Sequence, residues 1–182
     1  MRLRRVGKAA LAVVAGIGIV VLAVVVLASR DKSTVQRVSG PGQAFADQGT
    51  RHLHAGTPHA GFRYNSQPPT SGPHAFVPVT RDDVELDTDR LLTALESGDV
   101  VLVYGDRSLR PGLKALQDGI AGPFDAEVAR AGQAVVLSHN PRLVKSGVVA
   151  LAWAHLLRAS SPTDPGLRDF VEFWLGRGAD GG

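Results

Sequence analysis

Residues 91–104 read LLTALESGDVVLVY and predict one helix and one strand separated by a tight turn. The first three leucines fall on one helical face, because side chains three and four positions apart lie on the same side of a helix. Asp87 is a good N-cap upstream, and Gly98 is a good C-terminal stop. The run VVLVY, residues 100–104, is continuous and apolar, which is typical of a strand covered on both faces.

Three more helices are predicted downstream. Apolar residues recur at helical spacing over 109–120, where Ser108 can serve as the cap and a proline fits the first turn. A short helix is predicted over 123–131. The last helix is predicted to be capped by Asp164, with a proline in its first helical position. It carries an apolar stripe and ends at Gly176.

Two further apolar runs, residues 134–138 and 147–156, predict core strands. The Asn-Pro turn at 140–141 between them predicts a loose hairpin. The element order is then helix, strand, helix, strand, strand, helix. This order predicts an α/β or α+β fold, with a small mixed sheet of about three or more strands and helices packed against it.

The N-terminus predicts a membrane anchor. Residues 1–8 are basic, and residues 9–28 contain no charged side chain. A helix of that length spans about 30 Å, which matches the hydrocarbon core of a bilayer. The positive-inside rule puts residues 1–8 in the cytoplasm and the rest of the chain outside, so we expect a single-pass protein of the cell membrane. A cleaved signal peptide ending near Ala28 is the alternative, although signal cores are usually about 7–15 residues long.

Residues 29–182 divide into three parts by composition. Residues 29–50 are polar with Gly-Pro-Gly at 40–42, which predicts a stalk. Residues 51–178 hold the periodic segments and predict the extracytoplasmic domain, and residues 179–182 predict a flexible tail.

Charge and cysteine content exclude several functions. Residues 1–30 hold five of the 20 Lys and Arg residues and no acid, so the remainder has 15 basic against 17 acidic residues. No basic cluster of the kind that binds nucleic acid is left. The chain has no cysteine, which excludes disulfides, thiolate zinc sites and thiol catalysis.

The most unusual segment is the irregular stretch 51–83, which contains PPTSGPH at residues 68–74. The paired prolines fix φ near −65°, while the Thr-Ser-Gly triplet has the chemistry of a turn. His74 can donate one ring hydrogen to a carbonyl, so the segment is interpreted as a brace for the loop. Ser71, Glu96 and a histidine also have the residue types of a hydrolase triad, but no G-x-S-x-G turn surrounds the serine.

The segment resembles a known family. The resemblance is carried by Asp47-Gln48-Gly49, His52, Tyr64, the run 68–74, Leu95-Glu96-Ser97-Gly98, Val100-Val101, Tyr104, Val149 to Trp153 and Phe170. Together these residues are similar to the signature of the domain-of-unknown-function 3105 family, over about residues 45–178. The resemblance implies a bacterial, membrane-anchored protein for which the family supplies no activity.

One departure from the family pattern bears on function. The resemblance implies histidines at two positions where this chain has Thr93 and Ser97, while Glu96 and Gly98 are retained. If those histidines bind metal together with His74, this chain has lost part of the ligand set.

The histidines nevertheless allow a metal site. Zinc and copper take neutral imidazole nitrogens and carboxylate oxygens. His52 and His54 are two apart and share one side of an extended segment, and His74, Glu96 and His139 complete the candidate set. The spacings match no recognised metal motif.

The sequence therefore predicts a binding or scaffolding protein rather than an enzyme, with Tyr64, Ser71, His74 and Glu96 as candidate ligand-binding residues. The alternative is a transition-metal protein or metal-dependent enzyme with a partly degenerate histidine and glutamate site holding zinc or copper. The protein partner or small ligand is not indicated.

Overall fold

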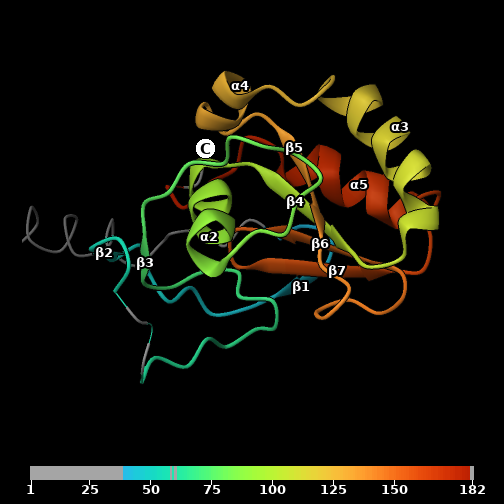
Figure 1. Ribbon diagram of the computed structural model, residues 1–182. Coiled ribbons are helices and arrows are strands. Elements are labelled where there is room, and N and C mark those ends of the chain that lie inside the picture. The colour runs from blue at the N-terminus through green and yellow to red at the C-terminus, as the bar shows by residue number, and fades with distance from the viewer. Residues whose placement is uncertain (1–38, 58, 60, 181–182) are drawn as a thin grey trace, which may run out of the picture. The chain divides into compact units, whose positions relative to one another are not determined.

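Strand β4 (Val100–Tyr104) runs between two neighbours inside a five-stranded sheet, as the run VVLVY predicts (Figure 1). All five of its side chains are buried. Alternate side chains face two different apolar clusters, one on each side of the sheet. The strand is therefore covered on both faces, which explains why its sequence is apolar without alternation.

The computed structural model of the protein describes residues 39–57, 59 and 61–180. The predicted basic N-terminus, 1–8, and the predicted membrane span, 9–28, lie outside the described residues. In the part of the chain that is described, none of the helices combines the length and apolar character needed to cross a membrane.

The sheet is mixed. Its strand order is β1 (Gln43–Ala44), β7 (His155–Ala159), β6 (Val148–Ala152), β4 and β5 (Val135–His139). Only the β4–β5 pair is parallel; the other three pairs are antiparallel. A parallel pair needs a crossover, which here consists of a 3₁₀ turn η1 (Arg107–Leu109), α3 (Arg110–Ile120) and α4 (Ala126–Arg130).

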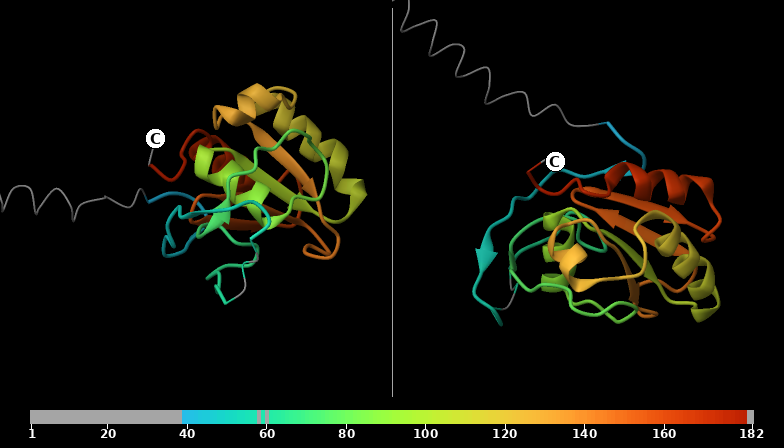
Figure 2. Two further views of the ribbon diagram at one scale, coloured as in Figure 1. Left: turned by 60° about the vertical axis from the view of Figure 1, so that its left-hand side comes forward. Right: turned by 90° about the horizontal axis from the view of Figure 1, so that it is seen from above.

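Helices cover both faces of the sheet. Helix α2 (Thr88–Ser97) and α4 contribute to one apolar cluster, while α3 and α5 (Pro165–Trp174) contribute to the other. Figure 2 shows α5 and α2 on opposite sides of the strands. The prediction of a small mixed sheet with packed helices is confirmed, and the layered arrangement is α/β.

Capping explains where most helices start. Asp87 accepts a hydrogen bond from the backbone N–H of Arg90, and Gly98 ends α2 with φ +114°. Asp164 caps α5 in the same way, by accepting from Gly166. Both predictions are confirmed. Ser108 is not a cap, however, because it lies inside η1 and its N–H is instead bound by the side chain of Asp106.

The prediction of one strand over 147–156 is wrong. The chain reverses at Trp153 and Ala154, so the apolar run is divided between β6 and β7. Turns are normally marked by polar or flexible residues because they face water. The turn at Trp153 and Ala154 is buried instead, which explains its apolar sequence. The N–H of Ala154 donates to the carbonyl of Thr70 in the segment that covers the turn.

The predicted hairpin between 134–138 and 147–156 is also wrong. Strand β4 lies between β5 and β6, and pairs with both. The Asn-Pro turn does exist, and Asn140 Oδ1 accepts from the N–H of Leu143. It leads the chain across the end of β4 rather than back along β5.

The domain begins earlier in the chain than composition indicates. Residues 43–44, assigned to the polar stalk 29–50, form β1 at the edge of the sheet. Trp174 Nε1 donates to the carbonyl of Pro41, and Phe45 packs against the core.

Candidate functional site

The segment 68–74, PPTSGPH, is buried along its whole length. The carbonyl of Thr70 accepts from Ala154 in the β6–β7 turn, and the hydroxyl of Ser71 accepts from the N–H of Gln48. Gly72 donates its N–H to the carbonyl of Gly49. The segment thus joins the N-terminal part of the domain to the sheet, as expected of a brace.

Two short parallel strands place His52 and His74 beside one another. Strands β2 (His52–Leu53) and β3 (His74–Ala75) are only two residues long, and the two histidines are directly paired. Their ring centroids are 5.4 Å apart, with the rings nearly perpendicular at 76°. Histidines 22 positions apart in sequence therefore form one cluster.

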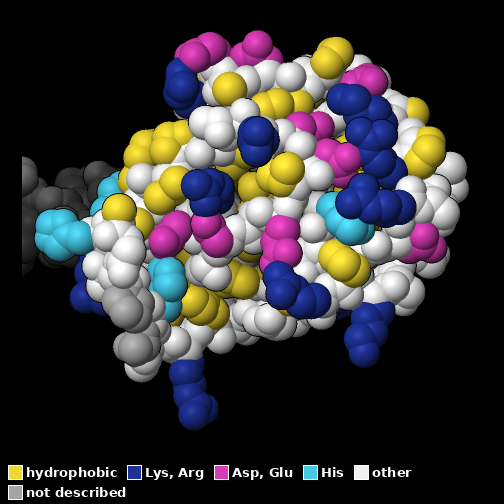
Figure 3. Space-filling view, in the orientation of Figure 1, with side chains coloured by type: hydrophobic (Ala, Val, Ile, Leu, Met, Phe, Trp, Pro, Cys, Tyr) yellow, Lys and Arg dark blue, Asp and Glu magenta, His cyan; other side chains and the backbone are white. Residues whose placement is uncertain are grey.

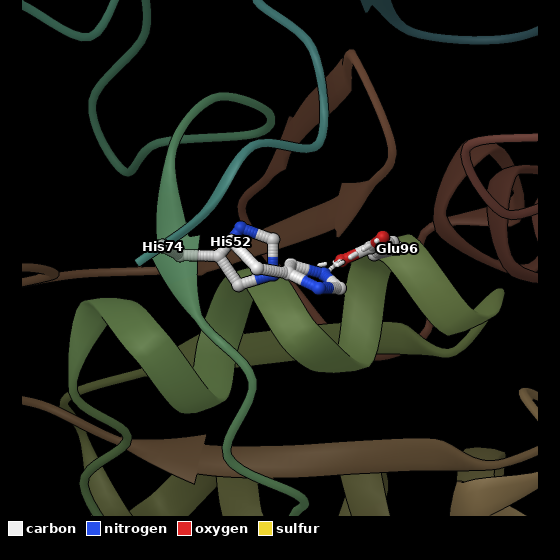
Figure 4. Close-up of side chains that lie close together, drawn as sticks. All are labelled: His52, His74 and Glu96. Carbon is white, nitrogen blue, oxygen red and sulfur yellow. Dashed lines mark hydrogen bonds and ion pairs between the residues drawn. The ribbon is translucent and has the colours of Figure 1, made fainter. Parts of the chain in front are cut away.

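Helix α2 supplies the third member, Glu96, from its last turn (Figure 4). His52 Nε2 lies 3.1 Å from Glu96 Oε1 and 2.9 Å from Oε2. His74 Nε2 also lies 2.9 Å from Oε2. Both imidazoles therefore approach one carboxylate, and the potential ligand atoms of the three residues all lie within 4.8 Å of one another.

The backbone carbonyl of Gly72 selects one tautomer of the neutral His74 ring. Its Nδ1 lies 2.9 Å from the carbonyl oxygen of Gly72, which can only accept a hydrogen bond. Nδ1 therefore carries the hydrogen, and in the neutral ring Nε2 has a free lone pair. The ring is fully buried, so its orientation is fixed by packing as well as by this bond.

That lone pair points at an anion. Nε2 of His74 is 2.9 Å from Glu96 Oε2, yet the geometry is not that of a hydrogen bond, and in the described part of the chain this buried nitrogen has no hydrogen-bond partner. A lone pair facing a carboxylate oxygen at this distance is repulsive. A positive charge at the cluster removes the repulsion, either as an added proton or as a metal ion.

Exposure differs across the cluster. The side chain of His52 is 48% exposed, that of Glu96 is 19% exposed and that of His74 is fully buried. The cluster is therefore anchored inside the domain at His74 and opens to solvent beside His52. Phe76 flanks this opening, with its ring centroid 5.7 Å from that of His52.

Two predicted metal ligands lie elsewhere. His54 is exposed and does not belong to the cluster. His139 ends β5, where its Nε2 lies 3.0 Å from the carbonyl of Gly105 and its ring packs against Tyr104. The predicted set of five residues is thus reduced to three.

Tyr64 and Ser71 have structural contacts. The hydroxyl of Tyr64 donates to the carbonyl of Pro73 at 2.7 Å. Burial, and to a lesser extent the negative charge of Asp89, raise the pKa of Tyr64 to about 12, so this phenol is neutral at physiological pH. The hydroxyl of Ser71 holds Gln48 and has no hydrogen bond to a histidine in the described chain, which leaves the hydrolase triad without its central contact.

A second group beside the cluster was missed by sequence reasoning. His59 Nε2 lies 3.1 Å from Asp89 Oδ1, and its Nδ1 lies 2.8 Å from the hydroxyl of Tyr64. Asp89 also accepts from the N–H of Ala75 in β3. These contacts hold β3 and the loop that contains His59 and Tyr64 against the start of α2. The sequence gives no signal for them, because an acidic residue such as Asp89 is common in the first turn of a helix.

Thr93 and Ser97 have backbone partners. The hydroxyl of Thr93 accepts from the N–H of Val77 and donates to the carbonyl of Ala75, while Ser97 donates to the carbonyl of Thr93. The departure from the family pattern at these positions leaves His52, His74 and Glu96 together.

Comparison with known proteins agrees with the resemblance. A family model described as "Protein of unknown function (DUF3105)" matches residues 56–180, which is more than half of the chain. No curated protein and no solved structure matches. The matched region contains His74 and Glu96 and starts four residues after His52. The chain therefore belongs to the DUF3105 family of proteins of unknown function.

Proposed function

We propose that this protein binds a divalent transition metal, zinc or copper, through His52, His74 and Glu96. The observation that carries the proposal is the buried Nε2 of His74, which lacks a hydrogen-bond partner in the described chain and lies 2.9 Å from a carboxylate oxygen. Its Nδ1 donates to a backbone carbonyl, which is the usual second contact of a metal-ligating histidine.

The ligand set suits these metals. Two imidazole nitrogens and a carboxylate oxygen are ligands of zinc and of Cu(II), and the absence of thiolates does not prevent either from binding. In a tetrahedral zinc site with bonds of about 2.0–2.1 Å, ligand atoms lie roughly 3.3 Å apart. The two 2.9 Å separations here need to open by only a few tenths of an ångström.

Three protein ligands leave at least one coordination position open. His52 is the most exposed of the three, so the open position faces solvent on its side. Structural zinc sites usually have four protein ligands, whereas sites that take up or react with small molecules keep an open position. The arrangement supports reversible metal binding or exchange with an external ligand more than a structural role.

A proton is the competing occupant. An imidazolium at His74 or His52 would form an ion pair with Glu96 and also remove the repulsion. This alternative predicts a buried ion pair that binds no metal, so metal titration separates the two.

The location is part of the proposal. The uncharged segment 9–28 after a basic start supports a single-pass anchor with the domain outside the cytoplasm. On this account the metal site is presented at the outer face of the cell membrane.

The test is calorimetric titration of zinc and of copper into the purified, chelator-treated chain without a histidine tag. We expect one equivalent to bind, with a loss of at least tenfold in affinity for His52→Ala and for Glu96→Gln. His54→Ala is the matched control, because it removes an exposed imidazole from the same segment and leaves the three ligands intact; its affinity should equal the wild type. Equal losses of metal affinity in His52→Ala, Glu96→Gln and His54→Ala would contradict the assigned site.

A further inference from the structure

A second site lies between α2, α4 and the segment that follows β3, beside the histidine cluster, with which it shares only Phe76. It is a pocket of about 190 Å³. Figure 3 shows hydrophobic side chains gathered on the surface near α2 and α4. The residues that line this pocket include Phe76, Val79, Ala129, Ser97, Asp99 and Arg130.

The polar centre of this pocket is Asp99. The residue is only 2% exposed and follows the glycine that ends α2. Its Oδ1 accepts from the N–H of Ala134, which joins the start of β4 to the start of β5. Its other oxygen, Oδ2, has neither a hydrogen-bond partner nor an ion-pair partner among the described residues.

A buried carboxyl with no counter-charge is unfavourable in its ionised form. Burial raises the pKa of Asp99 to about 8, and the single hydrogen bond from Ala134 offsets this only in part. A cation beside Oδ2 would stabilise the carboxylate and supply the partner that this oxygen lacks.

One other polar group of the pocket, the hydroxyl of Ser97, can still accept a hydrogen bond. Ser97 uses its only hydroxyl hydrogen on the carbonyl of Thr93, so its oxygen can still accept. The hydroxyl of Thr93 both accepts and donates within the backbone. The cationic residue at the rim, Arg130, is paired with Glu127.

The walls are apolar. Val79 and Ala129 are buried beside the pocket, and Phe76 is 57% exposed, the largest exposed fraction among the big hydrophobic side chains of the described chain. An aromatic face adds a favourable cation–π contact for an ammonium group. The pocket thus combines a small apolar space with acceptors and one uncompensated acid.

We propose that this pocket binds a primary alkylammonium group, whose N–H groups donate to Asp99 Oδ2 and Ser97 Oγ while its alkyl chain packs on Val79, Ala129 and Phe76. The group can come from a free amine or from a lysine side chain, which share this chemistry. The inference is independent of the metal site, because it uses none of its three ligands.

The test is titration of n-butylammonium chloride into the full-length chain. Binding is measured by calorimetry and by NMR chemical-shift changes of the Ala129 and Ser97 amides. We expect saturable binding with a Kd of about millimolar order. At pH 7, complex formation should release a proton, because the bound cation ionises Asp99; calorimetry in two buffers of different ionisation enthalpy measures this.

Asp99→Asn should weaken binding at least tenfold, and Asp118→Asn, an exposed acid on α3, should leave it unchanged. Melting curves verify that both variants fold. Nα-acetyl-lysine methylamide, titrated in parallel, distinguishes the two sources: binding equal to that of butylammonium assigns a lysine side chain, and weaker binding assigns a free amine. The proposal is overturned if n-butanol binds as well as butylammonium, if Asp99→Asn binds normally, or if butylammonium does not saturate.

Discussion

At the scale of the residue, His74 has two roles that a variant series can separate. Its ring stabilises the buried loop through Nδ1 and the carbonyl of Gly72, and it presents Nε2 to Glu96. His52 shares only the second role, because its side chain is half exposed and sits on the outer side of the cluster.

We therefore predict that His74→Ala lowers the free energy of unfolding by about 2–4 kcal/mol, through the cavity and the lost hydrogen bond. His52→Ala should cost less than about 1 kcal/mol, since the removed ring is already half exposed to solvent. Chemical denaturation of the metal-free chain gives both values. Unchanged stability of His74→Ala would show that the loop does not depend on this ring.

Gly72 is the other residue on which the loop depends. Its φ of +120° is a conformation that L side chains rarely adopt, and an added Cβ would lie 3.0 Å from ring carbons of Phe62 and Tyr64. Gly72→Ala should therefore cost about 1–3 kcal/mol in stability and weaken metal binding, because the carbonyl that orients His74 would shift. Normal metal affinity in a folded Gly72→Ala variant would contradict the orienting role of this carbonyl.

Several local features could be predicted from the sequence because each depends on one or two residues. The caps Asp87 and Asp164 and the stop at Gly98 act through their own side chain or backbone conformation. Glu96 and His74 could be chosen as candidate site residues from their chemistry and from a resemblance. His54 could not be excluded, because the alternation argument assumed a longer strand, whereas β2 ends at Leu53.

At the scale of the element, pairing between distant segments escaped prediction. The turn between β6 and β7 is apolar because the carbonyl of Thr70 and the rest of the loop cover it. Strand β4 lies between β5 and β6, and no local sequence pattern marks which strand pairs with which edge of β4.

At the junction between α2, β4 and β5, the buried Asp99 should make the stability of the domain depend on pH. The pKa of Asp99 is raised to about 8 by burial, against about 3.9 for an unfolded aspartate. Between these values the folded state holds a proton that the unfolded state releases. Stability should therefore fall as pH rises through this window, with a contribution of up to about 1.4 kcal/mol per pH unit.

Asp99→Asn should remove this contribution, because the amide oxygen can still accept from Ala134 and no charge can form. Urea unfolding between about pH 5 and pH 8 should show a flatter profile for the variant than for the wild type, with Asp118→Asn as the control. Parallel profiles for wild type and Asp99→Asn would mean that the carboxyl ionises without cost.

At the scale of the whole molecule, the candidate site depends on three segments that meet only in the folded domain. Pairing of β2 with β3 brings His52 to His74, and the last turn of α2 adds Glu96. Binding of a metal to all three would attach the loop to the helix, so it should raise the melting temperature of the domain.

The most direct test of the metal site is elemental analysis of the untagged protein purified without chelators. The account predicts about one equivalent of zinc or copper per chain, and its loss together with the extra thermal stability in Glu96→Gln. Less than about a tenth of an equivalent, with no rise in melting temperature when either metal is added, would contradict it.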